Sequence, residues 1–215
     1  MSTLAHELGH AYHGQQIETH RILNQDYTMP VAETASTFNE VVIMNAAINE
    51  AEGEEKLALI ESRLQDDTQI ICDIYSRFFF ESKVVNNRSE NFMFADELCN
   101  IMLEAQKEAY GDGLDHDVLH PFMWVCKGHY YSAGLGFYNF PYAFGGLFAR
   151  GLYAKFQQEG PAFLEKYNYM LKETPVRSVE DVAKICDIDL TSKDFWLMSL
   201  HSYDEVIAEF KRLVK

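Results

Sequence analysis

Apolar residues recur along most of the chain at the spacing of an α-helix. Between Glu54 and Val85 there is neither proline nor glycine. Apolar side chains return there at intervals of three, four or seven residues, at Leu57, Ile60, Leu64, Ile71, Ile74 and Phe78. Residues at these intervals share one face of a helix, so this stretch is predicted to form one long helix.

The same spacing predicts further helices, separated by turn residues. The expected helices cover residues 1–24, 31–50, 89–110, 141–158, 159–172, 178–186 and 191–213. Pro30 suits a first helical turn, whereas Gly111 and Gly113 mark a helix end. Residues 114–127 carry a weaker signal, and residues 128–136 are typical of a loop. Because no stretch alternates like a strand, the expected fold is all-α, with residues 1–215 forming one domain.

The acidic charge of the chain argues against negatively charged binding partners. Its 215 residues include 33 acidic and 18 basic side chains, which gives a formal net charge of −15. Contacts to phosphate need lysine and arginine, so neither nucleic-acid binding nor docking on anionic lipid is expected. No run approaches the roughly 20 apolar residues of a membrane span. The first ten residues lack the pattern of a signal peptide, and a cytoplasmic protein is expected.

The four cysteines are Cys72, Cys99, Cys126 and Cys186, and no two of them form a C-x-x-C pair. In a chain of this size, widely spaced cysteines indicate neither a disulfide framework nor a structural zinc knuckle. We expect free thiols, most of them buried.

Residues 6–10 read H-E-L-G-H and give the sharpest chemical signal in the chain. On a helix, His6 and His10 lie one turn apart on the same face and can offer two imidazoles to one metal ion. Glu7 reaches the open side of such a metal, where it can accept a proton from bound water. The alternative for so short a pattern is a chance match on a solvated helix.

The neighbours of this motif also carry expectations. Gly9 and Ala11 are small, so they are expected to let another element pack close to the first helix. His13 shares roughly the face of His6, seven residues earlier. We expect it in the core or as an indirect support of the site rather than as a ligand.

A catalytic zinc site needs a third protein ligand and a fourth position for water. Glu33 stands in the first turn of the next expected helix, and the intervening loop lets that helix turn back beside the first. Glu40, seven residues later, can accept a hydrogen bond from a ligand imidazole. The alternatives are a Glu33 that interacts with its own helix N-terminus and a solvated Glu40.

Taken together, these segments resemble a known family. Residues 6–13 (HELGHAYH) and 31–40 (VAETASTFNE) look like the M3 metallopeptidases, most of all their oligoendopeptidase F branch. The resemblance continues through residues 129–145 (HYYSAGLGFYNFPYAFG) and, more faintly, residues 195–196. It implies a zincin-like helical catalytic domain that binds one zinc ion per chain and cleaves short peptides in a deep channel. In that family's pattern, His6, His10 and Glu33 correspond to the zinc ligands and Glu7 to the catalytic glutamate.

The resemblance also implies a second group of residues, at 128–142. His129 corresponds to a histidine that contacts the substrate and helps to stabilise the tetrahedral intermediate. The matching tyrosine is Tyr138 or Tyr142, with Tyr138 slightly favoured. The other aromatic residues considered there are assigned to core packing: Tyr130, Phe137 and Phe140.

The chain departs from the family at its start, because members carry a large N-terminal portion ahead of the motif and only five residues precede His6 here. We therefore expect the C-terminal catalytic part of a longer enzyme. Its partners would be an oligopeptide substrate, that N-terminal portion and, through an exposed apolar face, further copies of the chain. The expected function is that of a zinc endopeptidase that cleaves oligopeptides internally. The alternatives are a catalytically inactive zinc-binding or interaction module and a zinc carboxypeptidase.

Overall fold

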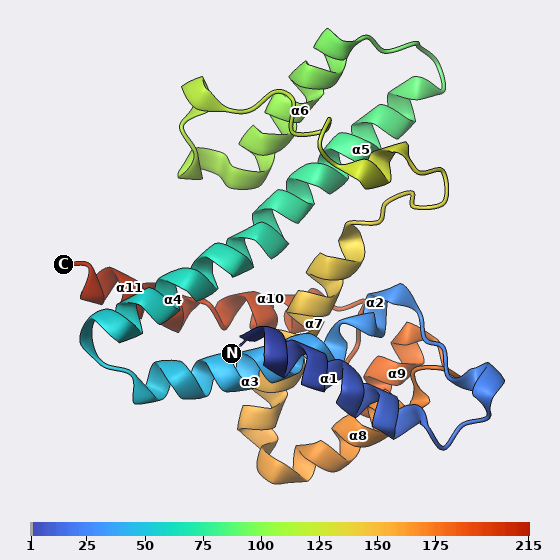
Figure 1. Ribbon diagram of the computed structural model, residues 1–215, viewed down its shortest axis with the longest axis vertical. Helices are drawn as coiled ribbons and strands as arrows, with labels where there is room; N and C mark the ends of the chain where they lie inside the picture. The colour runs from blue at the N-terminus through green and yellow to red at the C-terminus, as the bar shows by residue number, and fades with distance from the viewer. Residues whose placement is uncertain (1) are drawn as a thin grey trace. The chain divides into compact units, whose positions relative to one another are not determined.

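The computed structural model describes residues 2–215 and is built from helices joined by turns and short 3-10 segments (Figure 1). Over these residues it contains no strand, which confirms the all-α prediction. The chain divides into two compact units, one formed by Met1–Gln65 with Phe144–Lys215 and the other by Asp66–Ala143. The expectation of one catalytic domain over residues 1–215 stays a prediction.

The first unit contains most of the helices. They are α1 (Ser2–Ile17), α2 (Met29–Ala32), α3 (Thr34–Glu50), most of α4 (Gly53–Thr68), most of α7 (Phe140–Glu159), α8 (Phe163–Glu173), α9 (Val179–Ile185), α10 (Lys193–His201) and α11 (Asp204–Leu213). Within this unit α1 packs along α3 and against α8, and α8 packs on α9 (Figure 1). α1 is thereby held between α3, which is near it in the sequence, and α8, which is far from it in the sequence.

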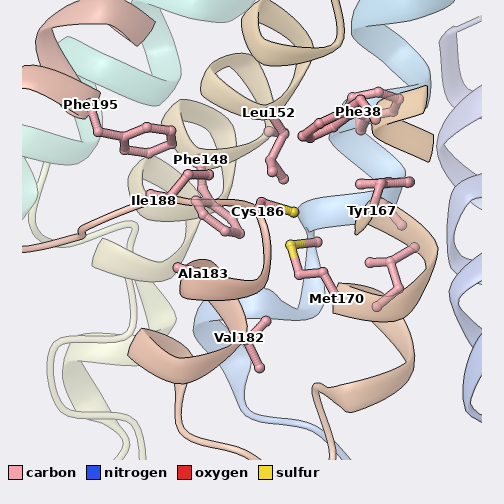
Figure 2. Close-up of a cluster of buried hydrophobic side chains, with 14 residues drawn as sticks. Phe38, Phe148, Leu152, Tyr167, Met170, Val182, Ala183, Cys186, Ile188 and Phe195 are labelled. Carbon is pink, nitrogen blue, oxygen red and sulfur yellow. The ribbon is translucent and has the colours of Figure 1, made fainter. Parts of the chain in front are cut away.

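A cluster of buried side chains forms the core of the first unit (Figure 2). Phe148 and Leu152 from α7 and Met170 from α8 are fully buried in it. Phe38 of α3 stacks on Tyr167 of α8 with ring centroids 4.5 Å apart. Burying such side chains contributes about 1.5–3 kcal/mol each, so this cluster fixes α3, α7 and α8 against one another.

Gly9 lies where α1 and α3 approach most closely. A Cβ atom at this position would stand 2.5 Å from the carbonyl oxygen of Ala35 and 2.5 Å from Cα of Ser36. The helices therefore meet backbone to backbone, and the expectation of close packing at Gly9 is confirmed. The parallel expectation for Ala11 is wrong, because that residue is exposed.

The second unit contains a π-helical segment η2 (Gln69–Asp73), α5 (Ile74–Arg88), α6 (Ala95–Tyr110) and three 3-10 turns, at Gly111–Gly113, His116–Val118 and Gly128–Tyr131. α5 and α6 pack on one another around Phe80, Ile101 and Met102. The ring of Trp124, from the following loop, stacks on Phe80 at 6.4 Å. These contacts hold the loop after α6 on the helix pair.

Several predicted helix ends differ from the observed ones. The first helix ends at Ile17 rather than at residue 24. Just after this end, the imidazole of His20 hydrogen-bonds to the carbonyl of Lys172, and the chain leaves the helical path. The helix predicted from residue 89 begins at Ala95, where the side chain of Glu97 accepts a bond from the Phe94 N–H. Both ends are set by side-chain hydrogen bonds rather than by hydrophobic periodicity.

The stretch predicted as one helix over 191–213 consists of α10 and α11. At the break the Ser202 hydroxyl donates to the carbonyl of Ser199, which competes with the helical backbone bonds. Tyr203 is buried there beneath the guanidinium of Arg150, 4.4 Å from its ring. The long helix predicted over 54–85 is present as consecutive α4, η2 and α5, with a π segment that the spacing did not indicate.

All four cysteines are free thiols, as expected. Cys186 is buried, Cys72 and Cys99 are half-buried and Cys126 is exposed, so the expectation of mostly buried thiols is only partly met. None of the helices within residues 2–215 combines the length and the apolar character that a membrane-spanning helix requires.

Candidate metal centre

Three ligand atoms from α1 and the start of α3 converge on one point. The Nε2 atoms of His6 and His10 are 3.1 Å apart, and Oε2 of Glu33 lies 3.3 Å from the first and 3.4 Å from the second. Ligands held at 2.0–2.1 Å by a tetrahedral zinc ion stand about 3.3 Å from one another. The three side chains are 25–33% exposed, so one side of the cluster is open to solvent.

Glu40 lies beside the nitrogen of His6 that faces away from the cluster. Oε1 of Glu40 lies 3.4 Å from Nδ1 of His6 and also accepts a bond from the Ser2 hydroxyl. A His6 ring that carries its proton on Nδ1 would direct that proton to this carboxylate and the lone pair of Nε2 to the cluster. Of the two alternatives for Glu40, this geometry favours the one that orients a ligand.

Glu33 occupies the junction between α2 and α3 and is held from several sides. The hydroxyl of Ser36 donates to Oε2 of Glu33 at 2.9 Å and lies 3.0 Å from its backbone carbonyl oxygen. A Cβ atom at Gly145 would stand 3.1 Å from Cβ of Glu33, so α7 backs closely onto this glutamate. Sequence reasoning missed both Ser36 and Gly145. The spacing of Ser36, three residues after a helix-initiating glutamate, was the one available signal.

Glu7 is exposed on α1, next to His6 in the sequence. This position leaves its carboxylate in water rather than in the core. His13, in contrast to Glu7, is fully buried. Its Nε2 lies 2.8 Å from the Thr174 hydroxyl, and its ring stacks on Tyr27 with centroids 4.1 Å apart. Burial lowers the pKa of His13 to about 4, so the side chain is a neutral core residue, as one of the two expectations had it.

His129, Tyr138 and Tyr142 come together in the second unit. They line a pocket of about 260 Å³ with Asn139, Arg77 and residues of η2. The two phenol oxygens are 2.8 Å apart, and the rings of His129 and Tyr138 lie 5.9 Å apart. The three side chains thus share one pocket. The zinc-ligand candidates belong to the first unit, and a common active site stays a prediction.

The aromatic residues assigned to packing in this loop behave differently from one another. Tyr130 packs on Phe80 and donates its hydroxyl to the carbonyl of Arg77, as expected of a core residue. Phe137 is half-buried against Phe78, in a left-handed backbone conformation with φ of 55°. The expectation for Phe140 is wrong, because its side chain is 44% exposed.

Comparison with known proteins adds to this geometry. The sequence model of peptidase family M3 matches residues 1–202. The chain belongs to this family. Relatives of this M3 chain include oligopeptidase PepF of Bacillus subtilis, 26% identical over 215 residues, and group B oligopeptidase PepB of Streptococcus agalactiae, 25% identical over 216 residues. Each alignment covers 99% of this chain but only 32% and 35% of those proteins, so the chain spans about a third of their length.

Solved structures show the same fold. The crystal structure of oligoendopeptidase-F from Enterococcus faecium superposes with a TM-score of 0.80 at 21% identity, over 99% of this M3 chain and 39% of that one. A crystal structure from Chlamydophila abortus superposes with a TM-score of 0.88 at 23% identity, over 99% of this chain and 36% of that one. The helical arrangement is therefore that of part of these larger molecules.

Proposed function

We propose that this chain is the zinc-binding catalytic part of an endopeptidase that cleaves oligopeptides at internal bonds. The observation that carries the proposal is the triangle of His6, His10 and Glu33, whose edges of 3.1–3.4 Å match those of a tetrahedral zinc site. Two imidazoles and a carboxylate also form a donor set that zinc prefers. Family membership and the oligopeptidase relatives support a peptide substrate.

The chain's own groups divide the work of hydrolysis in this proposal. His6, His10 and Glu33 would hold the zinc ion, which when bound would supply polarisation of a carbonyl and a water whose pKa is lowered to about 7. Glu7 accepts the proton of the attacking water and passes it to the leaving amine. Glu40 and Ser36 keep His6 and Glu33 in the orientation that binding requires.

We assign the donors for the developing oxyanion to His129 and to one of Tyr138 and Tyr142. The support is the family pattern together with the chemistry of phenol and imidazole donors, which stabilise negative charge on a carbonyl oxygen. The tyrosine that serves should be identified by single replacement with phenylalanine. Loss of one such donor costs about 10²–10³ in kcat, whereas the other replacement should cost far less.

The first measurement is the metal content of the purified chain. We expect one zinc per chain, and His6→Ala should lose it because two ligands remain. Glu7→Gln should retain the zinc and lose peptide cleavage by about 10²–10⁴, the usual contribution of a general base. Near-normal cleavage by Glu7→Gln would overturn the base assignment, and a metal-free wild-type chain would overturn the site itself.

The products of cleavage separate the endopeptidase from its alternatives. Mass spectrometry of an internally quenched peptide should show two fragments from an internal bond. Stepwise loss of C-terminal residues would instead identify a carboxypeptidase. Zinc binding without any cleavage would identify an inactive zinc-binding or interaction module, with activity confined to an assembly that includes the remaining two thirds of the relatives' length. A cytoplasmic location is part of this proposal.

A further inference from the structure

A line of polar groups runs through the second unit and ends on His129. Asn139, which is only 2% exposed, lies in its middle. Its Oδ1 is 3.3 Å from Nη1 of Arg77, and its Nδ2 is 2.6 Å from Nε2 of His129. Beyond Arg77 the line continues to the carboxylate of Asp73, which forms an ion pair with the guanidinium.

The direction of every bond in this line follows from its chemistry. A guanidinium only donates, so the Asn139 atom that faces Arg77 must be the carbonyl oxygen. The amide nitrogen then faces His129 and donates, which makes Nε2 of His129 an acceptor. A neutral imidazole with a bare Nε2 carries its proton on Nδ1. Rotating the amide by half a turn would bring its NH2 against the guanidinium, so Arg77 fixes the orientation of the amide.

Arg77 in turn is held in place by the π-helical segment. Asp73 is the last residue of η2, and its carboxylate pairs with Arg77 one turn later. The hydroxyl of Tyr130 donates to the carbonyl of Arg77 at 3.2 Å and ties the loop of His129 to α5. π-Helical segments are frequent at functional sites, and this one lines the same pocket as His129 and Tyr138.

We propose that Arg77 and Asn139 are positioning residues that hold His129 as the neutral Nδ1–H tautomer. Nδ1–H is then the only N–H donor of the ring, available to a carbonyl or oxyanion of a bound peptide. The use of that donor rests on the proposed function, whereas the tautomer itself is a property of the chain alone.

The charges around His129 act in the same direction. Burial lowers the pKa of this imidazole, and the positive charges of Arg77 and Lys127 lower it further. The carboxylate of Asp73 is paired with Arg77, and the aromatic neighbours Tyr130 and Tyr138 are phenols. A second proton on His129 would point an Nε2–H at the NH2 of Asn139, so protonation also breaks the line.

Two-bond ¹H–¹⁵N correlation spectra of the ¹⁵N-labelled chain test the proposal, with His129 assigned by its absence in His129→Gln. At pH 7.5 we expect a protonated Nδ1 and a bare Nε2 on His129. Its titration midpoint should lie below the ~6.5 of an ordinary histidine. An Nε2–H tautomer in the wild-type chain overturns the proposal, whether or not the chain binds zinc or cleaves peptides.

Three variants and one control identify the cause. Asn139→Asp replaces the donor that faces Nε2 by an acceptor, so the ring should switch to Nε2–H and its pKa should rise by about one unit or more. Arg77→Met frees the amide to rotate and should give a mixture of tautomers, whereas Arg77→Lys keeps charge and donors and should retain Nδ1–H. Lys127→Met is the matched control, because it removes a nearby charge and should raise the pKa without changing the tautomer.

The signals of the other histidines and the far-ultraviolet circular dichroism report whether each variant is folded. A folded Asn139→Asp or Arg77→Met chain that keeps a pure Nδ1–H tautomer overturns the positioning role. If either variant fails to fold, the other still decides the role. Absence of peptidase activity with the expected tautomers overturns only the proposed function.

Discussion

At the scale of single residues, the groups around His13 fix where its proton lies. The Thr174 hydroxyl donates to the carbonyl of Leu171 at 2.8 Å, so its oxygen is free to accept from Nε2 of His13. Nδ1 is then the bare nitrogen, and it is buried without a hydrogen-bond partner. A second proton would have to be placed there, inside the core.

This burial makes stability depend on pH. Because the pKa of His13 is lowered to about 4, the unfolded chain binds a proton between pH 6.5 and 4 that the folded chain does not. The free energy of unfolding should therefore fall as the pH drops through this window, by about 2 kcal/mol between pH 7 and pH 5. Urea titrations in the presence of a chelator should show this loss, and His13→Gln should reduce it by that amount. Equal losses in both chains would contradict the prediction.

The predictability of the candidate centre also differs from residue to residue. The convergence of His6 and His10 follows from helical spacing alone, because residues four apart lie on one face of a helix, whereas the role of Glu7 stays a prediction. Ser36 and Gly145 required the fold, since each matters through an atom of Glu33 that only packing brings close. The same holds for Asn139, whose role depends on a guanidinium 62 positions away in the sequence.

At the scale of elements, the contact of α1 with α3 joins the two halves of the candidate centre, since the histidines lie on α1 and Glu33 directly precedes α3. Gly9→Ala would place a methyl group 2.5 Å from backbone atoms of Ala35 and Ser36. The helices must then separate, and we expect a loss of about 1–3 kcal/mol in stability together with weaker zinc binding.

Gly14→Ala is the matched control for this prediction. Gly14 lies on the same helix, and a Cβ atom there would meet nothing within 4 Å. This replacement should stabilise the helix by up to about 1 kcal/mol and leave zinc binding unchanged. Isothermal titration of the metal-free chains with zinc measures both affinities, and equal affinities for Gly9→Ala and wild type would contradict a site built on this contact.

Element boundaries show why periodicity gives helices but not their ends. The spacing over 54–85 located a long helical stretch correctly, because burial of one face determines it. It could not indicate η2, where the backbone hydrogen bonding changes from that of an α-helix to that of a π-helix. The end of α1 and the break at Ser202 each depend on a single side-chain hydrogen bond, from His20 to the carbonyl of Lys172 and from Ser202 to the carbonyl of Ser199. Such bonds leave no periodic signal in the sequence.

At the scale of the whole molecule, zinc binding and folding should be coupled. The three proposed ligands converge only in the folded chain, so zinc stabilises the folded state. At a free zinc concentration of 100 times the Kd the gain is about 2.7 kcal/mol. With a shift of about 2–4 °C per kcal/mol for a domain of this size, the Tm should rise by about 5–11 °C. His6→Ala should abolish the rise, and calorimetry with and without zinc measures it.

The same calorimetry tests whether the chain unfolds as one domain. All three proposed ligands belong to the first unit, whereas Met102 is buried in the core of the second. If residues 1–215 form one cooperative domain, Met102→Ala should lower by a few degrees the same transition that zinc raises. Two transitions, one raised by zinc and the other lowered by Met102→Ala, would instead mean that the units unfold independently. The proposed zinc site and the residues around His129 would then lie on bodies of separate stability, and activity would depend on how they are held together.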